Sequence, residues 1–230
     1  MRPIRSSWVR PLLLAGTALA GATALIGWLH TASGLRVLSA LGVPCPITNV
    51  SAAQVVAGHE KGLAAMRGTT PAPLRSALGL ALDKTTELEA LAWATSKKLH
   101  CESLVRGLHY LRCRGVPSDA MGVAGPDISE MWLSFSPSSK LTGLNVYRRG
   151  LSASDMDMVW RHSTSRLRTE LGSPSTQFGD PSAASLLRSD LSTARVQYRF
   201  SNYLATVTAA NLSYAGLSVR EQYVSATSQN

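Results

Sequence analysis

An uncharged apolar segment near the N-terminus limits the possible folds of this chain more than any other feature. Residues 11–29 read PLLLAGTALAGATALIGWL, nineteen residues without a charge. As an α-helix rising about 1.5 Å per residue, this segment is about 30 Å long, which matches the hydrocarbon core of a bilayer. Arg2, Arg5 and Arg10 precede it, and positive residues are retained on the cytoplasmic side. The sequence therefore predicts a single-pass protein of the bacterial inner membrane, with a cytoplasmic N-terminus and a periplasmic C-terminal domain.

A cleaved signal peptide is the alternative to a retained anchor. The A-x-A sequence at 18–20 has the form of a cleavage site, but cleavage there leaves the apolar stretch GATALIGWL on the mature chain. Cleavage near 32–34 fits the end of the apolar run better. The length of the run favours the uncleaved anchor, because it is sufficient to cross the membrane.

A row of small residues runs along the predicted membrane helix. Gly16, Ala20 and Ala24 are spaced four residues apart, which allows another membrane helix to approach closely. An alanine-rich apolar segment without a partner explains the same row. We expect the segment 11–29 to contact membrane lipid and the chain to have a protein partner in the membrane or the periplasm.

Beyond this segment the composition is that of a folded protein. Hydrophobic residues make up 45% of the chain and charged residues 16%, which is enough apolar material for a core. The formal net charge is +9, so the remainder stays basic after the three N-terminal arginines are set aside. The expected organisation is a cytoplasmic tip with anchor or signal peptide at 1–34, a linker at 35–50, and two units at 51–150 and 151–230 that fuse into one domain.

The periodicity of apolar residues predicts an α+β fold. Helices are expected at 51–67, 83–100 and 152–171, and strands at 108–114, 130–136, 141–148, 195–200, 204–210 and 217–224. Two αβββ units of this kind form one antiparallel sheet with the helices on a single face. The predicted architecture is thus an N-terminal transmembrane helix followed by two αβββ units.

Two of the helices have clear start signals and apolar faces. Thr86 and Glu89 form a capping box, and we expect an apolar face made of Leu88, Leu91, Ala92 and Leu99. The helix 152–171 begins at Ser152 and stops at Gly172. Its apolar face is predicted to contain Met156, Val159, Trp160, Ser163, Leu167 and Leu171.

Three cysteines are present, Cys45, Cys101 and Cys113. Export places them in an oxidising compartment, where cysteines pair. If the chain folds back at Gly107 as a hairpin, Cys101 and Cys113 fall opposite each other on one face, and we expect them to form a disulfide. Two other pairings, both with Cys45, remain open.

The order of these elements resembles a known group of small exported modules. The helix ending in Leu171-Gly172-Ser173-Pro174, followed by a loop and an antiparallel meander, is similar to the BamE/SmpA-like α/β two-layer modules and to related duplicated inhibitor-type modules. The phrase SALGLALDKTTELEALAWA with its cysteine-flanked hairpin also resembles exported proteobacterial proteins. The resemblance implies a binding or scaffolding role, at the level of the fold.

The sequence contains no clear motif for catalysis, metal binding or cofactor binding. There is no G-x-S-x-G motif, no phosphate-binding loop, and no H-x-x-x-H or H-E-x-x-H spacing among the histidines His30, His59, His100, His109 and His162. We therefore expect no catalytic residues, no metal site and no cofactor.

Basic residues are the more suggestive feature. Several fall on or beside predicted strands, namely Arg112, Arg114, Arg148, Arg195, Arg199 and Arg220. If the helices cover one face of the sheet, these arginines gather on the other and offer a surface to phospholipid head groups, an anionic glycan or an acidic protein. A solvated face made basic to discourage edge pairing explains the same pattern. Nucleic acid is not expected, because the domain is predicted to be exported and no aromatic residues are seen between these arginines.

The leading functional hypothesis is a membrane-anchored, non-catalytic interaction or scaffolding module, an accessory subunit of an envelope or membrane-protein complex. The alternatives are an envelope enzyme or metal-binding factor whose site is assembled from dispersed residues, and a secreted inhibitor-like binder. The last of these requires cleavage of the N-terminal segment.

Overall fold

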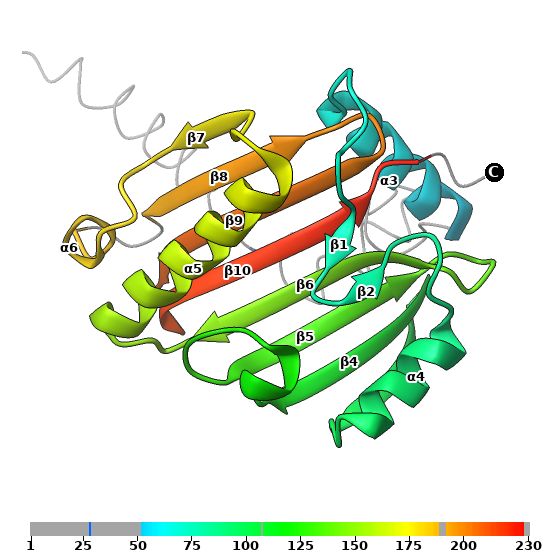
Figure 1. Cartoon of the computed structure of the whole chain (residues 1–230), viewed down its shortest axis with the longest axis horizontal. Coiled ribbons are helices and arrows are strands. Elements are labelled where there is room, and N and C mark those ends of the chain that lie inside the picture. The colour runs from blue at the N-terminus through cyan, green and yellow to red at the C-terminus, as the bar shows by residue number, and fades with distance from the viewer. Residues whose placement is uncertain (1–27, 29–51, 107, 189–191, 228–230) are drawn as a thin grey trace, which may run out of the picture. The chain divides into compact units, whose positions relative to one another are not determined.

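An antiparallel sheet that draws strands from both halves of the chain organises the structure (Figure 1). The computed structural model describes residues 28, 52–106, 108–188 and 192–227. In chain order, the elements are α3 (Ala52–Met66), β1 (Ser76–Ala77), β2 (Leu80–Ala81), α4 (Glu87–Ser96), β3 (Cys101–Arg106), β4 (Leu108–Val116), the 3-10 turn η2 (Asp119–Met121), β5 (Ile128–Phe135), β6 (Leu141–Arg149), α5 (Ala153–Leu171), β7 (Thr176–Phe178), α6 (Ala183–Leu186), β8 (Thr193–Arg199), β9 (Tyr203–Leu212) and β10 (Gly216–Ser225).

The sheet has eight strands in the order β3-β4-β5-β6-β10-β9-β8-β7. The first four follow α4 and the last four follow α5, and the two groups meet where β6 pairs with β10. Each predicted unit is therefore extended by one strand, β3 in the first and β7 in the second. The α+β class with one large antiparallel sheet is confirmed, and β1 and β2 form a separate small hairpin.

Helix α5 follows its sequence pattern closely. The Ser152 side chain accepts a hydrogen bond from the backbone N–H of Asp155 and so caps the first turn. The buried residues of the helix are the predicted ones, Met156, Val159, Trp160, Ser163, Leu167 and Leu171. This apolar face packs against β9 and β10 and forms the central part of the core.

Helix α4 begins as predicted, but its buried side only partly matches the predicted face. The capping box between Thr86 and Glu89 is formed in both directions. The predicted apolar face is correct only in part: Leu91 and Leu99 are half-buried and pack against the core, whereas Leu88 is 77% exposed. The fully buried residues of the helix are Ala90 and Ala94. Small alanines let the helix backbone approach the end of the sheet, where a bridge joins Thr86 to Lys140.

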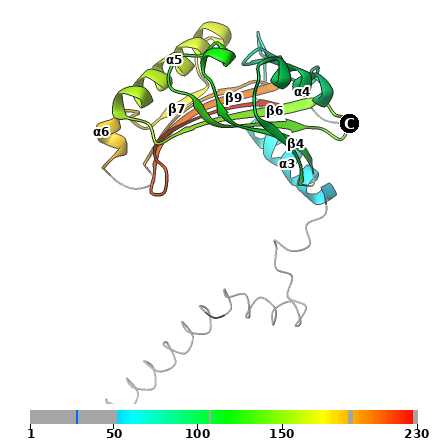
Figure 2. The same cartoon turned by 90° about the horizontal axis from the view of Figure 1, so that it is seen from below.

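Helix α3 lies on the opposite side of the sheet from α4 and α5 (Figure 2). Its Leu63 is buried with Leu204, Val224 and Ala226 in a small cluster separate from the main core. The expectation that all helices cover a single face is therefore wrong for α3. Sequence periodicity gives the apolar side of a helix but not the face of the sheet on which that side packs.

A glycine fixes the position of the end of α3. The backbone N–H of Gly68 donates to the carbonyl of Phe200 at 3.2 Å. A Cβ atom added at Gly68 would lie 2.2 Å from the backbone oxygen of Arg199, which is too close for any side chain. Only glycine permits this approach of the chain to the turn between β8 and β9.

The predicted cysteine pair is confirmed. Cys101 on β3 lies directly opposite Cys113 on β4, and the two form a disulfide. The bond ties the outermost strand of this half to the buried strand beside it. Cys45 lies outside the described residues.

The contacts divide the chain after Gln54, and the sheet with its helices belongs to the unit 55–230. Within the described residues, no helix is long and apolar enough to cross a membrane. The predicted anchor at 11–29, including Gly16, Ala20 and Ala24, lies outside those residues apart from Trp28. The anchor therefore stays a prediction.

Candidate functional site

The face of the sheet opposite α5 carries most of the arginines singled out by the sequence. Alternation along each strand directs every second side chain to this face, which we call the open face. The register places Arg112, Arg114, Arg195, Arg199 and Arg220 on it. The prediction that these five share one surface is in agreement with the observed pairing, and α3 covers only part of that surface.

Arg148 is the exception, and its predicted place on this face is wrong. Along β6 it shares a side with the buried Leu144 and Val146, so it points toward α5 and is 1% exposed. Its guanidinium forms an ion pair with Glu221 at 3.0 Å and donates to the carbonyl of Pro126 at 3.1 Å. The next residue, Arg149, has the opposite parity and occupies the open face instead.

The arginines of β4 and β6 are held by carboxylates. Glu130 pairs with Arg112 and, at 3.0 Å, with Arg149. Glu102 pairs with Arg112 at 3.3 Å and with Arg114 at 3.5 Å. Burial raises the pKa of Glu130, but hydrogen bonds from the two arginines outweigh it, so the pKa lies below the usual range. In this half of the face, the three arginines Arg112, Arg114 and Arg149 therefore each have a carboxylate partner.

Aromatic rings lie between the arginines, contrary to the expectation from the sequence. The guanidinium of Arg112 lies 4.9 Å from the Trp132 ring centre, and those of Arg149 and Arg220 lie 4.8 and 5.4 Å from the Tyr147 ring. A cation–π contact of this kind positions a guanidinium without removing its charge. The exclusion of nucleic acid therefore rests on predicted export alone.

These rings were missed although the sequence contained a signal for them. Within the predicted strand 130–136, Trp132 alternates with Met131 and Leu133, and the apolar residues Met131, Leu133 and Phe135 form the buried side. The parity that put those residues in the core also puts Trp132 on the open face. Tyr110 extends the same surface, with its ring edge-on to Trp132 at 5.9 Å.

The arginines of β8 and β10 are held differently. Arg199 donates to the side-chain oxygen of Gln197 at 2.7 Å, and Arg220 donates to that of Asn145 at 2.6 Å. Arg195 lies over the Phe178 ring at 5.5 Å. Within the described part of the chain, no carboxylate forms an ion pair with any of the three, which we call the β8–β10 arginines. Their charge is oriented by amides and rings but not neutralised.

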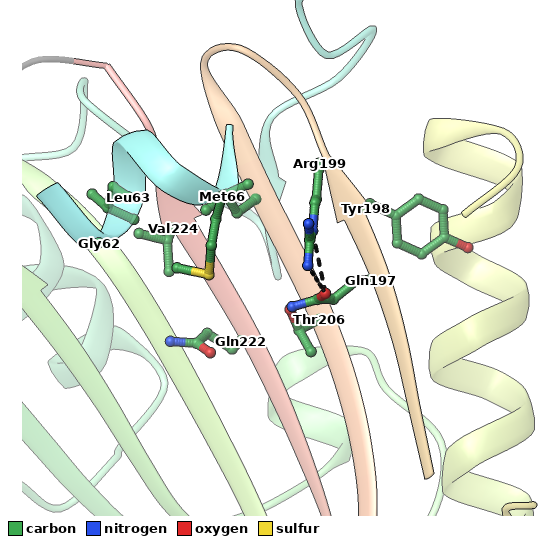
Figure 3. A pocket seen from close by; sticks show the side chains of 10 residues that line it. Gly62, Leu63, Met66, Gln197, Tyr198, Arg199, Thr206, Gln222 and Val224 are labelled. Carbon is green, nitrogen blue, oxygen red and sulfur yellow. Dashed lines mark hydrogen bonds between the residues drawn. The ribbon is translucent and has the colours of Figure 1, made fainter. Parts of the chain in front are cut away.

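A groove lies beside these arginines, between α3 and the sheet (Figure 3). Its volume is about 240 Å³. One side is apolar, formed by Leu63, Met66, Leu204 and Val224, and the other is polar, formed by Gln197, Arg199, Thr206 and Gln222. Tyr198 also lines it, but its ring points away toward α5. Gly62 of α3 faces the groove without a side chain.

A polar cluster is buried on the other side of the sheet, beneath α5. Glu221 accepts from Arg148 at 3.0 Å and from Arg166 at 2.7 Å, and the hydroxyl of Tyr223 donates to the same carboxylate. Burial, together with the charge of Glu221, raises the pKa of Tyr223 well above its usual value. Each member has a partner within the cluster, and the bond from Arg166 joins α5 to the sheet.

Histidines do not assemble into a site in the described structure. His100, His109 and His162 are exposed on separate elements, and His109 contacts Glu87 at 3.2 Å. Among the residues that the structure describes, no three histidine, cysteine, aspartate or glutamate side chains come together as metal ligands. His30 and the side chain of His59 lie outside the described residues.

No protein-family model, curated protein or solved structure matches this chain.

Proposed function

We propose that this chain is a non-catalytic interaction module held at the periplasmic surface of a bacterial inner membrane, and that its open face binds an acidic surface of a protein partner. The N-terminal segment 11–29 serves as the anchor. The partner is a subunit of an envelope or membrane-protein complex. In fold the module resembles the BamE/SmpA-like modules, and this likeness is part of the proposal.

The observation that carries the proposal is the set of β8–β10 arginines. A solvated face that only needs to stay soluble can pair its arginines with carboxylates, as Arg112 and Arg149 do with Glu130. Arg195, Arg199 and Arg220 are instead held in place by rings and amides that keep their charge available. Oriented arginines beside aromatic rings are typical of residues that contribute strongly to protein interfaces.

Site-specific photo-crosslinking tests this proposal. Thr208 lies between Arg220 and Arg195 on the open face, whereas Thr169 is exposed on α5 on the opposite side of the sheet. We expect a photoreactive residue at position 208 to give a defined crosslinked protein in native membranes, and one at position 169 to give none.

The charge dependence of the crosslink decides whether the partner is acidic. Replacement of Arg195 and Arg220 by glutamine should remove the product, and raising the salt concentration should weaken it, because exposed charges are screened. Arg161→Gln, on the outer side of α5, is the matched control. Equal products from positions 208 and 169, or a product indifferent to both arginines, would contradict the proposal.

N-terminal sequencing tests the anchor separately. A chain purified from membranes should begin at Met1. A mature chain that begins near residue 34 supports the secreted, inhibitor-like alternative instead.

A further inference from the structure

The groove beneath α3 and the residues around it form an ordered series of chemical environments along the strands. Directly paired residues define cross-strand rows, and successive open-face rows are two residues, or about 7 Å, apart. The row nearest α3 contains Val224, Leu204 and Arg199, the next contains Gln222, Thr206 and Gln197, and the third contains Arg220, Thr208 and Arg195. The first row is apolar on β9 and β10 with Arg199 at its β8 end, the second is neutral and polar, and the third carries two arginines around Thr208.

The middle row is placed to receive an anion. The side chains of Gln222, Thr206 and Gln197 offer amide N–H and hydroxyl donors at the floor of the groove. Arg199 belongs to the first row, next to the middle one. Its guanidinium donates to the Gln197 side-chain oxygen at 2.7 Å. The third row adds Arg195 and Arg220 on the far side. An anionic group over the middle row therefore has the groove-lining Arg199 on one side and the row that contains Arg195 and Arg220 on the other.

The apolar side of the groove is placed to receive a chain. Leu63 and Met66 project from α3 toward Val224 on the sheet (Figure 3). Leu204 lines the same side of the groove and is buried in one cluster with Leu63 and Val224. Gly62 widens the groove, because a Cβ atom added there would meet nothing within 4 Å. A volume of about 240 Å³ is below the ~300–1,000 Å³ of sites for drug-sized molecules. The groove therefore suits one short alkyl chain with its head group, and not a two-chain lipid.

We propose that this groove is a binding site for an amphipathic anion, a single alkyl chain that ends in a carboxylate or a phosphate. The chain lies beneath α3 and the head group lies over Gln222, Thr206 and Gln197. This assignment goes beyond the interaction with a protein partner. It is tested on the purified chain without any partner, so that failure of either proposal leaves the other to be judged separately.

Four probes that share parts of the expected ligand test the site directly. Octyl phosphate and octanoate have both the chain and the charge, octanol has only the chain, and inorganic phosphate has only the charge. With the full chain in nanodiscs of phosphatidylcholine, calorimetric titration should show saturable binding of at least one of the first two. It should bind at least tenfold more tightly than octanol and inorganic phosphate. The stronger of the two shows whether the natural head group is a phosphate or a carboxylate.

Chain length provides a second readout. Each methylene that becomes fully buried should tighten binding by about fourfold, so hexyl phosphate should bind more weakly than octyl phosphate by about an order of magnitude. Lengthening the chain well beyond eight carbons should bring smaller gains once the groove is full.

Two matched pairs of variants locate the binding. Gly62→Leu fills the groove and should abolish binding, whereas Gly58→Leu adds the same side chain elsewhere on α3, where an added Cβ also meets nothing. Both changes favour the helix over glycine, so loss of folding does not explain a difference. Arg199→Gln should weaken binding at least tenfold, whereas Arg161→Gln on α5 should not.

The assignment is overturned if octanol binds as tightly as the charged probes. It is also overturned if no probe binds, as expected for a groove that a protein segment fills, or if the Gly62 and Arg199 variants bind like their controls.

Discussion

Replacing Glu221 by glutamine should destabilise the fold more than any other single change of charge. The Glu221 side chain is 2% exposed and accepts hydrogen bonds from Arg148, Arg166 and Tyr223. Arg148, itself 1% exposed, keeps only neutral acceptors in this variant, namely Pro126, Ser118 and the amide oxygen of the new glutamine. An uncompensated charge buried in this way costs about 3–5 kcal/mol.

The loss of unfolding free energy arises mainly from Arg148 and much less from Arg166. The Arg166 side chain is 27% exposed and retains Glu170 at 3.7 Å, so water and a second carboxylate compensate it. Because a domain of this size is stable by about 5–15 kcal/mol, the loss is a large part of the total. Urea unfolding of the full chain in mild detergent, followed by tryptophan fluorescence, measures it as a shift of the midpoint at constant slope.

Two further variants make the reasoning refutable. Asp157→Asn breaks an exposed ion pair with Arg161 on α5 and should cost less than 1 kcal/mol. The double replacement Arg148→Met with Glu221→Gln removes the buried cation together with its partner and should recover most of the loss. If Glu221→Gln is as mild as Asp157→Asn, or if the double variant is no more stable than Glu221→Gln alone, the assigned cause is wrong.

Three other changes test separate parts of the fold. Replacing Cys101 and Cys113 together by alanine opens a loop with a sequence separation of 12 and should cost about 2–3 kcal/mol in urea unfolding. The pKa of Glu130 is lowered, so its ionised form stabilises the fold above the usual carboxyl pKa and this contribution is lost as the pH falls through the lowered value. The difference in unfolding free energy between the wild type and Glu130→Gln should therefore be largest near neutral pH and should shrink below about pH 4. Gly68→Ala forces the chain away from the backbone of Arg199 and should reduce hydrogen-exchange protection of α3 while leaving that of α5 unchanged.

Local signals in the sequence were sufficient for some elements because their cause is local. The cap of α5 and its apolar face depend on residues within the same nineteen-residue helix, and both are observed as predicted. The cysteine pair followed from the symmetry of a hairpin around Gly107. For such features, periodicity and capping chemistry are nearly the whole physical explanation.

Other features depended on partners distant in sequence. Arg148 and Arg149 are adjacent basic residues, and only the burial of Leu144 and Val146 decides which of them faces α5. The buried Glu221 that compensates Arg148 is on β10, seventy-three residues away. The alanine side of α4 is buried because of where the helix packs, at the end of the sheet where Thr86 bridges to Lys140. Hydrophobicity alone favoured Leu88, which is exposed.

The position of α3 connects its stability to whatever occupies the open face. Its Leu63 is buried in a four-residue cluster outside the main core, so among the described side chains a small apolar cluster holds the helix against β9 and β10. An element with few buried contacts opens at a lower free energy than the rest of the fold. A molecule bound between α3 and the sheet contacts both, and it stabilises the closed arrangement in proportion to its own binding free energy. Because α3 directly follows residues 35–50, which are predicted to be a linker, a molecule bound in the groove should stabilise the first helix of the domain.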